Sequence, residues 1–97
     1  MKIVLNQNHI PFTLSAKAEK WLRSHDRDDD DWDRTDPLLV QCIEELGEDA
    51  SGIMYGAKCK LAVVDWDETY DVYMYVSDYQ ESLRPLYELT VYKARLP

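Results

Sequence analysis

Residues 36–47 read DPLLVQCIEELG and carry the clearest structural signal in the chain. Asp36 suits the N-cap of a helix. Pro37 suits the first helical position, because the N–H that proline lacks has no partner there. Apolar side chains then recur with a period of about 3.6 residues, at Leu39, Cys42, Ile43 and Leu46. Gly47 favours the positive φ that often ends a helix. The stretch therefore predicts an amphipathic helix that packs on one side.

The flanking sequence predicts a second helix and several strands. Ser15 is a suitable N-cap, and the helix after it is expected to end near Ser24, with an apolar stripe at Leu14, Ala18, Trp21 and Leu22. Short β-prone runs occupy residues 1–5, 59–64 and 70–76, and a last strand is expected at 87–91, after Pro85. We predict an α+β fold in which two helices pack on one face of a small antiparallel sheet. We expect residues 1–97 to form one domain, with an acidic loop at about 25–36.

Charge narrows the choice of partners. The chain has a net charge of −8, and residues 25–36 contain seven aspartates and two arginines, a net charge of −5. An acidic surface repels nucleic acid and anionic membranes and attracts basic protein surfaces. No apolar run approaches the roughly 20 residues that span a bilayer. Cys42 and Cys59 match no disulfide or zinc pattern, so two free, buried thiols in a cytoplasmic protein are expected.

The acidic loop has two specific interpretations besides a solvated loop. Counted from Asp26, a calcium-binding EF-hand loop requires glycine at its sixth position and glutamate at its twelfth, where this chain has Asp31 and Pro37. We therefore expect no metal site. Closely spaced carboxylates can also imitate the phosphates of nucleic acid and occupy a basic groove of another protein.

The aromatic strand predicts where a partner binds. If Tyr70, Val72, Met74 and Val76 face the core, the alternate residues Tyr73 and Tyr75 lie on the outer face beside Asp71. Tyrosines near acids are typical anchors of protein interfaces. The predicted partner-binding residues are Asp71, Tyr73 and Tyr75, joined by Asp28, Asp29, Asp30 and Asp31 of the loop. A homodimer interface or packing within the chain are the alternatives for this face.

Motifs for catalysis are absent from the sequence. His9 and His25 have no nucleophile motif beside them, and there is no phosphate-binding glycine loop or zinc signature. Glu44 and Glu45 are adjacent, so they point in different directions around a helix. We expect no enzyme activity, no catalytic residues and no cofactor.

Two longer stretches, RTDPLLVQCIEELGEDASG at 34–52 and AKCKLAVVDW at 57–66, carry a family resemblance. Their DP…EELG…AxG…AxLxVV pattern resembles a family of short, uncharacterised phage, prophage and bacterial proteins. The resemblance covers most of residues 1–83 and implies a shared fold and phage or prophage ancestry, with no catalytic residues to transfer. Members of that family usually have a proline-containing turn where this chain has Asp65-Trp66-Asp67.

Together these features predict a phage-type accessory protein that binds and inhibits a host or defence protein. It would belong to the anti-CRISPR or anti-restriction type, and nucleic-acid mimicry is one way it could act. The alternative is a homodimeric structural or assembly factor without inhibitory activity, and a small hydrolase is the third reading. The expected partner is a protein with a basic surface.

Overall fold

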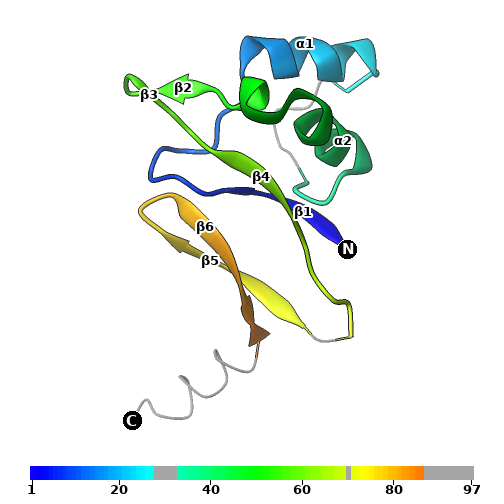
Figure 1. The fold of residues 1–97 in the computed structure, drawn as a ribbon, viewed down its shortest axis with the longest axis vertical. Helices are drawn as coiled ribbons and strands as arrows, with labels where there is room; N and C mark the ends of the chain where they lie inside the picture. Colours follow the sequence, from blue (N-terminus) through cyan, green and yellow to red (C-terminus); the bar gives the residue numbers. More distant parts are fainter. Residues whose placement is uncertain (28–32, 70, 87–97) are drawn as a thin grey trace.

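The secondary structure comes from a computed structural model of the chain, which describes residues 1–27, 33–69 and 71–86 (Figure 1). Its two α-helices and one 3₁₀-helix lie among six short strands. In chain order the elements are β1 (Lys2–Asn6), α1 (Ala16–Ser24), α2 (Pro37–Leu46), η1 (Gly47–Ala50), β2 (Ile53–Met54), β3 (Ala57–Lys58), β4 (Leu61–Asp65), β5 (Val72–Ser77) and β6 (Gln80–Pro85).

Both α-helices begin as their sequences predict. The Ser15 hydroxyl accepts a hydrogen bond from the Ala18 N–H at 3.0 Å, and the Asp36 carboxylate accepts one from the Leu38 N–H at 2.9 Å. Pro37 occupies the first position of α2, and Gly47 ends the helix with a φ of +58°. These caps satisfy N–H groups that a helix leaves without partners at its start.

The strands pair antiparallel in three two-stranded sheets, β1 with β4, β2 with β3, and β5 with β6. In the first sheet Val4 lies opposite Val63 and Asn6 opposite Leu61. The α2 helix packs on both β1 and β4, while α1 packs on α2 and η1. Both helices lie on the same side of the β1–β4 pair (Figure 1). The α+β fold class, with two helices on a small antiparallel sheet, is confirmed.

The core lies between the helices and the β1–β4 pair. It contains Cys42 and Cys59, which are buried free thiols as predicted. The other buried members are Val4, Ala18, Leu22, Leu39, Val40, Ile43, Ala50 and Leu61. Gly52 lies against this core where the backbone of Leu14 passes, and a Cβ atom there would meet the Leu14 carbonyl oxygen at 2.8 Å. The apolar faces predicted for the helices and for the strand at 59–64 are thus the faces that pack.

The prediction for β5 is wrong in one respect. Met74 and Val76 were expected in the core, but their side chains are 41% and 51% exposed. Val72 is half-buried, and Tyr70 lies outside the described residues. The physical reason is that the helices cover β1 and β4, whereas the β5–β6 hairpin lies at the far end of the molecule (Figure 1). The alternation of residues correctly separates the two faces of β5. However, no described layer covers the face that carries Met74 and Val76.

The chain after β5 also differs from expectation. A strand was predicted beyond Pro85, at residues 87–91, which lie outside the described residues. The strand that pairs with β5 is instead β6, with Pro85 as its last residue, opposite Val72. The segment was missed because its sequence QESLRP is mostly polar and lacks clear apolar alternation.

Candidate partner-binding hairpin

The β5–β6 hairpin is closed by a two-residue turn at Asp78 and Tyr79. Their φ values are +48° and +67°, the left-handed conformation that both central residues of a type I′ turn require. Ser77 and Gln80 form the pair next to the turn, and the ladder extends from there to Val72 opposite Pro85. Glycine or asparagine usually occupies such positions, so the positive φ of Tyr79 carries a conformational cost.

An ion pair attaches β6 to the rest of the fold. Arg34 Nη2 donates to Glu81 Oε2 at 2.9 Å, and the Glu81 side chain is only 8% exposed. Glu81 Oε1 also accepts the Asn6 N–H at 2.8 Å. Arg34 itself bonds the edge of β1, because its carbonyl accepts the Val4 N–H and its guanidinium donates to the Val4 carbonyl. On the edge of β1 that faces away from β4, Arg34 and Glu81 therefore provide partners for the Val4 backbone groups and for the Asn6 N–H.

A second attachment is the buried side chain of Asn6. Its Nδ2 donates to the carbonyls of Ile10 and Tyr79, and its Oδ1 accepts from the N–H groups of Asn8 and Lys60. One amide group thus joins β1, the loop after it, the start of β4 and the hairpin turn. Because a buried amide must have partners for its donors and acceptor, this arrangement fixes where the turn lies.

The two faces of the hairpin expose different chemistry. Val72, Met74 and Val76 share one face, and Tyr73 and Tyr75 share the other. On the second face Tyr73 is half-buried, and Tyr75 is 39% exposed. The guanidinium carbon of Arg84 lies 3.9 Å from the centroid of the Tyr75 ring, a cation–π arrangement. A cation therefore lies on the Tyr75 ring, on the face where the acid Asp71 was predicted.

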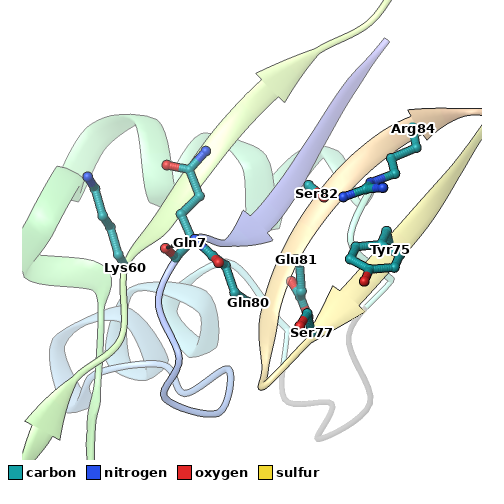
Figure 2. Close-up of a pocket in the computed structure, with 8 residues that line it drawn as sticks. All are labelled: Gln7, Lys60, Tyr75, Ser77, Gln80, Glu81, Ser82 and Arg84. Carbon is teal, nitrogen blue, oxygen red and sulfur yellow. Dashed lines mark hydrogen bonds between the residues drawn. The ribbon is translucent and has the colours of Figure 1, made fainter.

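A groove of about 460 Å³ runs along this tyrosine face (Figure 2). Lys60 and Arg84 contribute its cations, and neither pairs with a carboxylate among the described residues. The one acid in the lining, Glu81, is neutralised by Arg34. The lining residues are Gln7, Lys60, Tyr75, Ser77, Gln80, Glu81, Ser82 and Arg84. The groove is therefore polar and locally basic on a chain that is acidic overall.

The structure places some of the predicted binding residues together and leaves others undescribed. Asp71 is exposed at the start of β5, on the same face as Tyr73 and Tyr75. Asp28, Asp29, Asp30 and Asp31 lie outside the described residues. Sequence reasoning missed the exposed Met74, Val76 and Tyr79. The exposure of Met74 and Val76 could have been suspected from the uncharged run VYMYVS, which has an aspartate at each end.

The described residues offer little for metal or thiol chemistry. Within residues 1–27, 33–69 and 71–86, no three histidine, cysteine, aspartate or glutamate side chains gather as metal ligands do. Burial raises the pKa of the Cys42 thiol to about 11, and the nearby Glu45 carboxylate adds to the shift. A thiol with so high a pKa is protonated at neutral pH and is a poor nucleophile.

Comparison with known proteins gives no family assignment. No family model, curated protein or solved structure matches the chain. None of the helices in the described part of the chain is both long and apolar enough to cross a bilayer.

Proposed function

We propose that this chain is a phage-type accessory protein without enzyme activity, which acts in the host cytoplasm by binding and inhibiting a host or defence protein. The binding surface is the β5–β6 hairpin, with Tyr73, Tyr75 and Asp71 joined by Met74 and Val76. The target is a protein with a basic surface, which would meet the exposed acids Asp71 and Asp78 at the ends of β5 and not the groove lined by Lys60 and Arg84.

One observation carries this proposal: the hairpin exposes large apolar side chains on both of its faces. Met74 and Val76 are exposed on one face, Tyr75 on the other, and Tyr79 is 55% exposed at the turn. Within the described chain, β5 packs extensively against β6 alone. Apolar side chains that gather on one element, in place of scattering singly, are typical of protein-binding surfaces.

The residue types suit an interface. Tyrosine and arginine are enriched among residues that dominate binding energy, and Arg84 stacked on Tyr75 presents both together. Methionine adapts its shape to a partner because its side chain is unbranched. Asp71 and Asp78 are exposed at the two ends of β5. These acids favour encounter with a basic partner over distances of about 8 Å at physiological ionic strength.

A capture experiment with matched variants tests the proposal. The immobilised protein is exposed to bacterial lysate, and the retained proteins are identified by mass spectrometry. The hairpin variant is Met74→Ser with Tyr75→Ala. The control is Ile53→Ser with Tyr55→Ala, since these residues of the β2–β3 hairpin are at least as exposed. We expect a protein retained by the wild type and the control and lost from the hairpin variant.

The second stage tests inhibition. The captured protein is purified, and its own activity is measured as the accessory protein is added up to equimolar amounts. Loss of that activity with the wild type, but not with the hairpin variant, supports the proposal. Identical sets of captured proteins for both variants, with both folds intact by circular dichroism, place binding elsewhere. A wild-type protein that is a stable homodimer by light scattering and captures nothing favours an assembly factor.

A further inference from the structure

The backbone of β5 has one edge that β6 does not use. In an antiparallel pair, alternate residues exchange hydrogen bonds with the partner strand. Leu86 N–H donates to the Asp71 carbonyl at 3.0 Å, and Ser77 pairs with Gln80 next to the turn. Residues 71, 73, 75 and 77 therefore bond toward β6. It follows that Val72, Met74 and Val76 direct their N–H and C=O groups away from it, and β5 pairs with no other described strand.

The side chains of β5 do nothing to protect this edge. Folded proteins usually discourage pairing at a sheet edge with a lysine, a proline, a bulge or a covering segment. The strand VYMYVS contains no charge, no proline and no glycine, and its pairing with β6 is regular over all six residues. A six-residue edge of this kind is a template for another strand.

Charges stand at both ends of the edge. Asp71 precedes the strand and Asp78 follows it, both are exposed, and neither forms an ion pair with a described residue. A strand that pairs along β5 would place residues near both aspartates. Basic residues at the two ends of that strand would be attracted, and acidic ones repelled.

We propose that the outer edge of β5 binds an extended segment of the partner protein by strand addition, and that this segment is apolar in its centre and basic at both ends. The inference rests on the proposed function, and it assigns the mode of binding and the chemistry of the partner. Main-chain hydrogen bonds to Val72, Met74 and Val76 provide affinity, and the flanking charges select the sequence.

A second copy of the chain fits this edge less well. Two β5 strands paired antiparallel about Met74 bring Asp71 of each copy beside Asp78 of the other. Like charges then gather at both ends of the pair, and such contacts oppose association. The same arrangement is favourable when the incoming strand ends in lysine or arginine.

Two variants of one residue separate strand addition from side-chain contact. Met74→Pro removes an N–H that points away from β6, so the β5–β6 ladder remains, as proline is tolerated on the open side of an edge strand. Met74→Ala keeps this N–H and shortens the side chain. The probes are two eight-residue peptides that alternate valine and threonine between end residues, one with lysine ends and one with glutamate ends. Binding is followed by NMR, and hydrogen exchange of β5 is measured with and without peptide.

We expect the lysine-ended peptide to bind and to protect the Val72, Met74 and Val76 amides. The glutamate-ended peptide should bind at least about fivefold more weakly. Met74→Pro should weaken binding by about tenfold or more and Met74→Ala by much less, with both folds intact by circular dichroism. Protection of those three amides in the free protein, no binding of the lysine-ended peptide, or equal losses for the two variants would overturn strand addition. The capture experiment could still succeed in each case, so a failure of strand addition would leave the proposed function in place.

Discussion

At the scale of single residues, Asn6 has more influence on the fold than its polar character suggests. Its buried amide makes four hydrogen bonds, to Asn8 and Ile10 in the loop after β1 and to the distant residues Lys60 and Tyr79. The loss of its side chain would leave part-buried carbonyls and N–H groups without these partners, and an unsatisfied buried group destabilises a fold by about 1–3 kcal/mol.

Asn6→Ala should therefore lower the free energy of unfolding by about 2–4 kcal/mol in a urea titration. Asn8→Ala is the matched control, because the Asn8 amide bonds Lys58 at an exposed position and its loss should change stability by less than about 1 kcal/mol. Equal effects of the two substitutions would argue against a central role for Asn6.

Cys42 should make stability depend on pH in the alkaline range. Its folded pKa of about 11 lies above the ordinary value of 9.0. Both states are protonated well below pH 9, so no stability is lost there. As pH rises from 9 to 11 the unfolded thiol ionises first, and the free energy of unfolding should fall by up to about 2–3 kcal/mol. Cys42→Ala should be less stable at pH 8 but should show a shallower decline above pH 9. Parallel curves for the two proteins would contradict this account.

At the scale of elements, the Arg34–Glu81 ion pair connects the hairpin to β1. Removal of the arginine leaves a carboxylate that is 8% exposed without its cation, a change that typically destabilises by about 3–5 kcal/mol. In a double-mutant cycle with Arg34→Met and Glu81→Gln, the double variant should lose about 1–3 kcal/mol less than the sum of the single variants. The exposed Lys2–Glu44 pair, treated with the same substitutions, should couple by less than about 0.5 kcal/mol.

The hairpin turn offers a gain in stability. Tyr79 has a φ of +67°, where glycine avoids a penalty of about 1 kcal/mol. Tyr79→Gly should therefore raise the free energy of unfolding by up to about 1 kcal/mol, whereas Tyr79→Ala, which keeps a Cβ atom, should not. If the exposed ring contacts the partner, the glycine variant should bind it more weakly while being more stable. A less stable glycine variant would show that the ring packs favourably in the free protein.

At the scale of the whole molecule, stability should be uneven. The core cluster draws its residues from β1, α1, α2, η1 and β4 and from neighbouring segments, but it includes no described residue of β5 or β6. Native-state hydrogen exchange should report the global free energy of unfolding for amides in α2 and for the β1–β4 ladder. The β5–β6 amides should exchange through a local opening of lower free energy. Uniform protection across all strands would indicate that the hairpin unfolds only with the core.

Features that depend on neighbouring residues could be predicted from the sequence. The caps at Ser15 and Asp36, the end of α2 at Gly47 and the apolar faces with Cys42 and Cys59 follow from short-range hydrogen bonding and periodicity. These elements were predicted because their signals lie within one helix or one strand.

Whether a second layer covers a face of β5, and what charge surrounds its tyrosines, depends on the tertiary structure. Alternation assigns Met74 and Val76 to one face, but whether that face is buried depends on where the helices pack. Likewise, the contacts of Arg34 with Glu81 and of Arg84 with Tyr75 join residues through the fold and through strand register. Sequence spacing does not predict these contacts, because they form only when β6 lies beside β1 and β5 pairs with β6.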